Sequence, residues 1–235
     1  MKIDLRIGRN FCRLNIDEIV IICHGLPYEI GSAIDKSYDR IAEFFSKRGI
    51  PSLVFDFSGT GKSQGQFSLI SWLEDLENIV SNFERVHVVG FSMGGTIAYN
   101  IKAESYGIIA SPFSLMFDEN TLKAIYSNAI LKGILRGLKD FDTFKNKFIE
   151  EFSVIAPENS KPKRNVLVIH GAEDNIVPPD HGIRLFKYSK KPKKLVLIEN
   201  GDHFLRKIPA IYKIIYEWIV SDKDKDEEKI ESIKI

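Results

Sequence analysis

Short apolar runs, rich in β-branched residues, recur along the chain, and stretches with helical spacing of apolar residues separate them. Most of these runs are apolar on both faces of the pleat, which is typical of parallel strands covered by helices on both sides of a sheet. Strands are predicted at 19–23, 52–57, 86–91, 106–111, 165–171 and 194–200, and helices at 35–48, 68–84, 93–104, about 180–189 and 205–220. This alternation predicts an α/β fold with a doubly wound, mostly parallel sheet.

The two ends of the chain depart from this alternation. Residues 2–15 read as two short strands around Gly8, Arg9 and Asn10, and a hairpin there would add an antiparallel edge to the sheet. The C-terminal tail, 221–235, is densely charged, and we expect a frayed helix or disorder there.

A long connection at 112–164 lacks a strong strand pattern, and structureless loops of this length are rare inside compact domains. It contains the segment AIYSNAILKGILRGL, whose apolar residues recur at helical spacing. We interpret 1–235 as a single domain that carries a small helical insertion at 112–164. The residues expected on one helical face are Ile130, Leu131, Ile134, Leu135 and Leu138.

The charge and composition of the chain argue against nucleic acid and membranes as partners. Lys and Arg total 33 and Asp and Glu total 32, for a formal net charge of +1, so no basic excess favours nucleic acid. No apolar run approaches the roughly 18 residues of a membrane span, and the start MKIDLRIGRNF lacks the apolar core of a signal peptide. We therefore expect a cytoplasmic protein without stable membrane insertion, in which Cys23 is a buried free thiol and forms no disulfide with Cys12.

The segment SGTGKS at 58–63 follows a predicted strand and looks like a phosphate-binding loop. Such a loop needs a further glycine five positions before Gly61, and that position holds Asp56. A carboxylate there would repel a phosphate group. We therefore expect no nucleotide cofactor and interpret 58–63 as a glycine-rich turn at one wall of a neighbouring site.

The turn after the strand at 86–91 carries the strongest chemical signal. Residues 90–94 read Gly-Phe-Ser-Met-Gly, a Gly-x-Ser-x-Gly motif between a strand and a helix. The flanking glycines permit a cramped turn that lifts the Ser92 hydroxyl clear of the backbone. The N–H groups at the start of the following helix favour negative charge beside it.

A serine nucleophile needs a base, and the base needs an orienting acid. Asp174 follows the strand at 165–171 and His203 follows the strand at 194–200, so both fall at the carboxyl edge of the sheet with Ser92. The chain order Ser92, Asp174, His203 is one known order of the Ser-His-Asp triad. The backbone N–H groups of Leu26 and Met93 are placed to hold a developing oxyanion.

The remaining histidines are weaker candidates. His87 lies within a strand, His170 closes a strand before the acid, and His181 follows Asp174 too closely to leave its strand end. His24 precedes the Leu26 loop, and we favour a loop-ordering role for it over a catalytic one.

At this point the sequence resembles the α/β-hydrolase family over roughly 19–111 and 165–220. The matching segments, in order, are HGLP, FDFSGTGKS, GFSMGG, HGAEDNIVPP and NGDHF. Within the family the chain looks most like small esterases and the monoacylglycerol-lipase or serine-aminopeptidase-like branch. The resemblance implies an eight-stranded sheet and a lid or cap at 112–164. One departure is Ser58, where many relatives have arginine, so an ion pair that braces the loop would be missing.

These features predict a serine hydrolase that cleaves carboxylic esters of short to medium acyl chains through an acyl-enzyme, with no metal or cofactor. The expected partner is a small-molecule acyl ester, and a homodimer stays open. Thioesters, lysophospholipids or a peptide's N-terminal residue are alternative substrates. An aminopeptidase would need an anion for the substrate amine, from Glu119, Glu150 or Glu151. A non-catalytic binding protein with a hydrolase fold is the other alternative.

Overall fold

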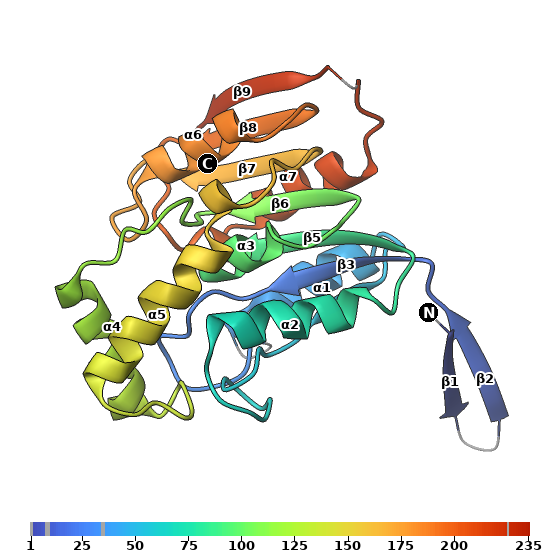
Figure 1. Ribbon diagram of the computed structural model, residues 1–235. Coiled ribbons are helices and arrows are strands. Elements are labelled where there is room, and N and C mark those ends of the chain that lie inside the picture. Colours follow the sequence, from blue (N-terminus) through green and yellow to red (C-terminus); the bar gives the residue numbers. More distant parts are fainter. Residues whose placement is uncertain (1, 8–9, 34–35, 225) are drawn as a thin grey trace.

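A parallel β-sheet organises the computed structural model, which describes residues 2–7, 10–33, 36–224 and 226–235 (Figure 1). The strand order is β4-β3-β5-β6-β7-β8-β9, and every neighbouring pair is parallel. The predicted α/β fold is thus confirmed. The strands are β3 (Glu18–Cys23), β4 (Ser52–Val54), β5 (Arg85–Phe91), β6 (Ser105–Ile109), β7 (Val166–Gly171), β8 (Lys193–Ile198) and β9 (Glu228–Ile233).

Helices cover both faces of the sheet because successive strand residues point to opposite sides. Ile22 packs with α1 (Tyr38–Ser46) and α7 (Pro209–Val220) in one core. Ile21 belongs to the other core, which contains apolar side chains of the two helices between β6 and β7, described below, and of three further helices. These three helices are α2 (Leu69–Val80), α3 (Met93–Ala98) and α6 (Pro179–Tyr188). Central strands such as β6 and β7 are therefore buried at every position.

The N-terminal hairpin forms but does not extend the sheet. Strands β1 (Lys2–Ile7) and β2 (Asn10–Asn15) pair antiparallel as a separate two-stranded sheet. Both edges of β3, the next strand, are taken by β4 and β5. The expected antiparallel edge is therefore wrong, and the main sheet has seven strands within the described residues instead of the eight that the resemblance implied.

The charged C-terminal tail contains a strand rather than the expected frayed helix or disorder. Strand β9 pairs in parallel with β8 at the edge of the sheet. Lysine and glutamate side chains face one another across this pair: Lys193 Nζ lies 3.3 Å from Glu228 Oε1, and Lys194 Nζ lies 2.8 Å from Glu231 Oε2. Ion pairs between the two strands thus support the pairing of β8 with β9, although the tail lacks the apolar pattern that predicts a strand.

Two helices, α4 (Glu119–Lys132) and α5 (Phe141–Ile155), form the segment between β6 and β7, together with a short 3-10 turn, η2 (Pro157–Asn159). They lie near the carboxyl ends of the strands (Figure 1). Asp118 caps α4 by accepting from the Thr121 N–H at 2.7 Å, and Asp140 caps α5 by accepting from the Thr143 N–H at 2.9 Å. Helix capping side chains of this kind fix where each helix begins.

The single apolar face expected for 130–138 is wrong, because α4 ends at Lys132. Gly133, with φ 62°, turns the chain out of the helix in the left-handed conformation. Ile134 and Leu135 are buried beyond that turn, whereas Leu131 is 84% exposed. The helical spacing of the apolar residues therefore continues past the point where the backbone leaves the helix.

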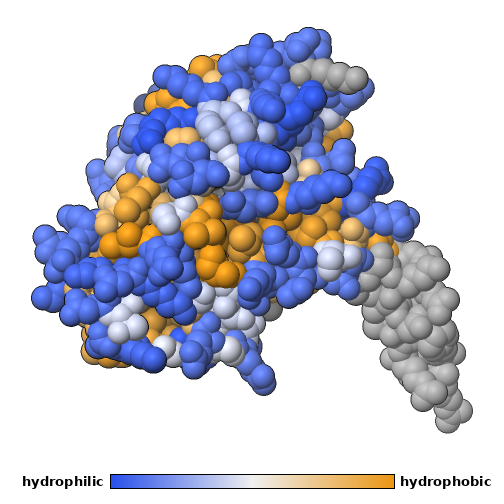
Figure 2. Space-filling model, in the orientation of Figure 1, coloured by the Kyte–Doolittle hydropathy of each residue, from blue (hydrophilic) through white to orange (hydrophobic). Residues whose placement is uncertain are grey.

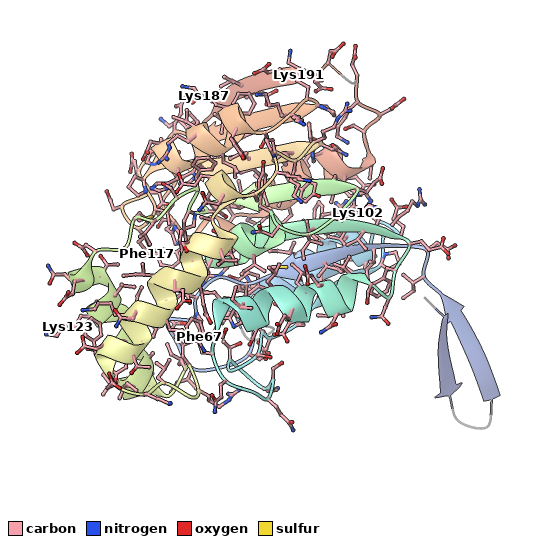
Figure 3. The ribbon with its side chains drawn as sticks, in the orientation of Figure 1. Phe67, Lys102, Phe117, Lys123, Lys187 and Lys191 are labelled. Carbon is pink, nitrogen blue, oxygen red and sulfur yellow. The ribbon has the colours of Figure 1, made fainter. Side chains whose placement is uncertain are left out.

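Aromatic packing joins α5 to the segments that precede α2 and α4. Phe117 packs edge-on against Phe148 at 5.2 Å, and Phe67 packs against Phe144 at 6.3 Å between ring centroids. Figure 3 labels Phe67 and Phe117, which approach α5 from two sides. On the surface of this face, hydrophobic side chains form patches between mostly hydrophilic ones (Figure 2).

Candidate active site

Ser92 occupies a strained turn between β5 and α3. Its φ of 53° and ψ of −127° are unusual for a residue with a side chain, and such strain clusters at functional sites. The turn requires glycines on both sides. A Cβ at Gly90 would lie 2.4 Å from Gly95 Cα, and a Cβ at Gly94 would lie 2.3 Å from the His24 carbonyl oxygen. The Gly-x-Ser-x-Gly spacing therefore follows from close backbone packing around the serine.

Asp174 and His203 meet at the ends of β7 and β8. His203 Nδ1 donates to Asp174 Oδ2 at 2.8 Å, while Asp174 Oδ1 accepts from the N–H groups of Ile176 and Val177. Burial alone would raise the pKa of the Asp174 carboxyl, but hydrogen bonds from His170 and His203 outweigh it and hold the pKa well below its usual range. The carboxylate is thus ionised and fixed in orientation.

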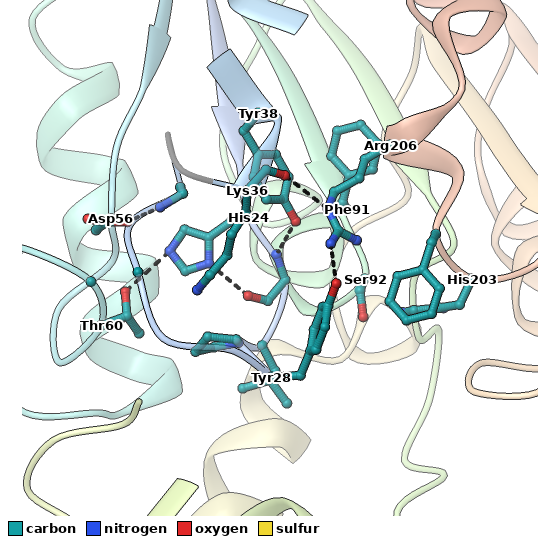
Figure 4. Close-up of a pocket in the computed structure, with 17 residues that line it drawn as sticks. His24, Tyr28, Lys36, Tyr38, Asp56, Thr60, Phe91, Ser92, His203 and Arg206 are labelled. Atoms are coloured by element: carbon teal, nitrogen blue, oxygen red, sulfur yellow. Dashed lines mark hydrogen bonds between the residues drawn. The ribbon is translucent and has the colours of Figure 1, made fainter. Parts of the chain in front are cut away.

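The hydrogen bond to Asp174 determines which ring nitrogen of His203 is available to accept a proton. With Nδ1 protonated and donating to the carboxylate, neutral imidazole carries its lone pair on Nε2. Ser92 and His203 line one pocket (Figure 4), whose volume is about 50 Å³. The structure therefore brings the three residues predicted from the sequence to the same edge of the sheet.

The two residues whose backbone N–H groups are predicted to hold an oxyanion, Leu26 and Met93, belong to segments that adjoin Ser92. Met93 is the first residue of α3, and Leu26 lines the pocket after β3. The loop before Leu26 touches the serine closely, because a Cβ at Gly25 would lie 2.9 Å from Ser92 Cβ. Neither the Leu26 nor the Met93 N–H donates a hydrogen bond to another residue that the structure describes.

His24 fastens two loops together, in agreement with the loop-ordering role favoured above. Its Nδ1 donates to the Gly25 carbonyl at 2.7 Å, and its Nε2 accepts from the Phe57 N–H at 3.1 Å. Both nitrogens are therefore engaged in the neutral ring. Burial lowers the pKa of His24 to about 4, so the ring stays uncharged near neutral pH.

The other histidines have structural contacts as expected, but one of them touches the acid. His87 bonds to Ser105 and Glu18, and His181 Nδ1 accepts from the Phe113 N–H. His170 is fully buried, and its Nε2 lies 2.9 Å from the Val177 carbonyl and 3.5 Å from Asp174 Oδ2. This second histidine beside the carboxylate was not predicted from the sequence, although its position four residues before the acid was the available signal.

The loop at 58–63 is not arranged to hold a phosphate. The Asp56 carboxylate fills its centre, accepting from the Lys62 N–H at 2.9 Å and from the Ala33 N–H at 2.6 Å. A Cβ at Gly61 would lie only 2.2 Å from Asp56 Oδ2. The glycine is therefore needed for the close approach of an aspartate. Gly61 also lines the pocket with Ser92, in agreement with the interpretation of this turn as a wall of a neighbouring site.

The loop at 58–63 has two braces that compensate for the missing arginine at Ser58. The Ser58 N–H and hydroxyl donate to the Asp75 carboxylate at 2.7 and 2.9 Å. Arg136, which follows α4, donates to the carbonyls of Thr60 and Gly61 at 2.9 and 3.0 Å and also contacts the Ser63 carbonyl. An arginine from the segment between β6 and β7 thus also holds this loop.

The glutamates considered for an aminopeptidase do not line the pocket with Ser92. Glu119 pairs with Lys145 at 3.2 Å. Glu151 accepts from the Ser68 hydroxyl and the Leu69 N–H, both at 2.7 Å, and so caps α2.

Among the residues that the structure describes, no three His, Cys, Asp or Glu side chains come together as a metal site would require. No helix in that part of the chain is long and apolar enough to cross a membrane.

Comparison with protein families finds one match that spans most of the chain. Residues 20–207 match the family described as "Alpha/beta hydrolase family". The uncharacterized protein YfhR of Escherichia coli strain K12 is 26% identical over 173 residues, which cover 69% of this chain and 56% of that protein. The chain therefore matches little more than half the length of this relative.

Solved structures with the same fold include two named hydrolases. The esterase EaEST of Exiguobacterium antarcticum has a TM-score of 0.66 at 15% identity, covering 88% of this chain and 94% of that one. The monoacylglycerol lipase of Paleococcus ferrophilus has a TM-score of 0.63 at 20% identity, covering 86% and 93%. At these identities the likeness establishes the fold.

Proposed function

Because the chain belongs to the alpha/beta hydrolase family, we propose that it is a serine hydrolase that cleaves carboxylic esters of short to medium acyl chains. The contact between His203 and Asp174, in a site shared with the strained Ser92, is the observation that carries this proposal. The esterase and the monoacylglycerol lipase among the structures of the same fold agree with this reaction class.

In the first half-reaction, Ser92 Oγ attacks the acyl carbonyl carbon while its proton passes to His203 Nε2. Asp174 holds the imidazole in the required tautomer and stabilises the imidazolium that forms. The tetrahedral intermediate then collapses. The bond from carbon to the leaving oxygen breaks, and the His203 proton moves to that oxygen to release the alcohol and leave an ester on Ser92.

Water completes the cycle by the same steps. His203 Nε2 takes a proton from water, whose oxygen attacks the acyl-enzyme carbonyl. The bond to Ser92 Oγ breaks, the proton returns to Oγ, and the carboxylic acid leaves. In both half-reactions the N–H groups of Leu26 and Met93 stabilise the oxyanion, and a single such donor is typically worth about 100- to 1000-fold in rate.

The insertion at 112–164 is proposed to act as the lid of this site. Lys132 Nζ donates to the Tyr28 carbonyl at 2.7 Å, and Asn128 Nδ2 donates to the same oxygen at 3.3 Å. Tyr28 lines the pocket. Helix α4 is therefore fastened to the pocket wall, and its position affects access to Ser92.

Substitution of the nucleophile tests the proposal. We expect Ser92→Ala to abolish hydrolysis of p-nitrophenyl butyrate, measured as release of p-nitrophenol. The matched control is Ser153→Ala, which removes an exposed hydroxyl on α5. Near-normal turnover by Ser92→Ala would refute the mechanism. Parallel assays with acyl-CoA, lysophospholipid and aminoacyl-anilide substrates separate an esterase from the alternative hydrolases, and inactivity of the wild type on all of them would favour a binding protein.

A further inference from the structure

A buried arginine lines the same pocket as the proposed nucleophile. Arg206 lies three residues after His203, in the 3-10 turn η3 (Leu205–Lys207), and is only 7% exposed. Figure 4 shows its side chain together with Ser92, His203 and Tyr28 around the pocket. A permanent positive charge therefore borders the space where the substrate would sit.

Aromatic rings hold the Arg206 guanidinium in place. Its central carbon lies 5.5 Å from the ring centroids of Tyr28 and Tyr38 and 5.3 Å from that of Phe204. Nη2 donates to the Tyr28 hydroxyl at 2.8 Å, and Nε donates to the Lys36 carbonyl at 3.4 Å. Each of these partners is uncharged. The side chain is thus oriented without being neutralised.

The charge of Arg206 has no carboxylate partner within 4.0 Å among the residues that the structure describes. Asp56 also lines the pocket, but its carboxylate binds the N–H groups of Ala33 and Lys62. Nη1 of Arg206 donates to no described residue. Burying a charge without a counter-charge is costly, so a ligand that supplies the missing charge would bind strongly.

We propose that Arg206 forms an anion subsite and that the preferred substrate is a monoester of a short dicarboxylic acid. The free carboxylate would bind the Arg206 guanidinium while the esterified carboxyl lies at Ser92. Guanidinium groups match the planar carboxylate geometry, and a pocket of about 50 Å³ favours a short chain between the two carboxyls. The proposal rests on the esterase function above and adds the class of acid to it.

Paired substrates test the subsite by kinetics. The ratio of kcat/KM for mono-p-nitrophenyl succinate to that for p-nitrophenyl butyrate measures how much the free carboxylate of the substrate raises kcat/KM. We expect this ratio to be well above one in the wild type and to fall about 10- to 100-fold in Arg206→Gln, with an intermediate fall in Arg206→Lys. Arg48→Gln is the control, since Arg48 stacks on Phe44 at 3.5 Å outside the pocket. An equal ratio in wild type and Arg206→Gln would overturn the subsite.

Direct binding tests the subsite without turnover. Calorimetric titration of the wild type with succinate should show saturable binding at least about 10-fold tighter than with the neutral analogue succinamide. Arg206→Gln should remove this preference. The comparison of the two ligands needs only the wild type, so it decides the matter even if the variant does not fold.

The two proposals fail in distinguishable ways. Hydrolysis of the butyrate ester without preference for succinate would overturn the anion subsite and leave the esterase function standing. Preferential succinate binding without hydrolysis of either ester would overturn the esterase function and leave the subsite standing. A uniform loss of stability and of activity on both esters in Arg206→Gln, with no succinate preference in the wild type, would mean that Arg206 only holds Tyr28 and Tyr38 in place.

Discussion

His203 Nδ1 lies 2.8 Å from Asp174 Oδ2, although the two residues are 29 positions apart in the chain. This contact fixes the tautomer that presents Nε2 as a base. We therefore expect Asp174→Asn to lower kcat by about 10⁴-fold, because an amide can favour the opposite tautomer. Ester hydrolysis measures the loss, with the exposed neighbour Glu173→Gln as the control. A kcat within tenfold of the wild-type value would show that the pair does not orient the base.

Arg136 joins the insertion to the loop at 58–63. Replacement by Met keeps most of the apolar stem but removes the donors to the Thr60 and Gly61 carbonyls. We expect Arg136→Met to lower the free energy of unfolding by about 1–3 kcal/mol, measured by urea denaturation. Lys123→Met, on the exposed surface of α4, is the control. Equal losses in the two variants would show that the clamp adds nothing to stability.

His24 should make the fold sensitive to mild acid. Its pKa is about 4 in the folded protein, against an ordinary value of 6.5. Above pH 6.5 its contribution to stability is fully present. Between pH 6.5 and 4 the unfolded chain binds a proton that the folded chain does not, so stability falls by roughly 3 kcal/mol in total.

The pH dependence of unfolding can be assigned to His24 by substitution. His87 and His181 also have lowered pKa values, chiefly through burial, and add to the same trend. The slope of unfolding free energy against pH between pH 6.5 and 4 is proportional to the number of protons that unfolding takes up. His24→Gln should therefore lower this number by about one, and the slope should not fall to zero, because His87 and His181 still contribute. Urea denaturation at several pH values gives this slope, and an unchanged slope in the variant would contradict the assignment.

The sheet and the residues at its carboxyl edge could be predicted because buried strands and close backbone packing require apolar residues and glycines at particular positions. Strands such as β5 and β7 are apolar on both pleat faces, and Ser92 sits in a glycine pattern that close backbone packing requires. Parallel strands end at one edge, so Asp174 and His203 could be placed near Ser92 from their positions alone.

Three further features escaped prediction because their causes are interactions between distant residues. Strand β9 pairs through charged side chains that read as a solvated tail. Arg136 acts on carbonyls more than seventy positions earlier. Arg206 looks like a surface residue until the rings of Tyr28 and Tyr38 are seen around it. The pattern of residues within a short segment of sequence does not predict contacts with distant segments.

Covalent labelling of Ser92 by a fluorophosphonate tests the central claim most directly, because the reagent reacts with serines that are activated as nucleophiles. Mass spectrometry of the digested protein identifies the modified residue. The proposed mechanism predicts stoichiometric modification of Ser92 in the wild type and a much slower reaction in His203→Gln. An unmodified Ser92, or labelling at the same rate in both proteins, would contradict it.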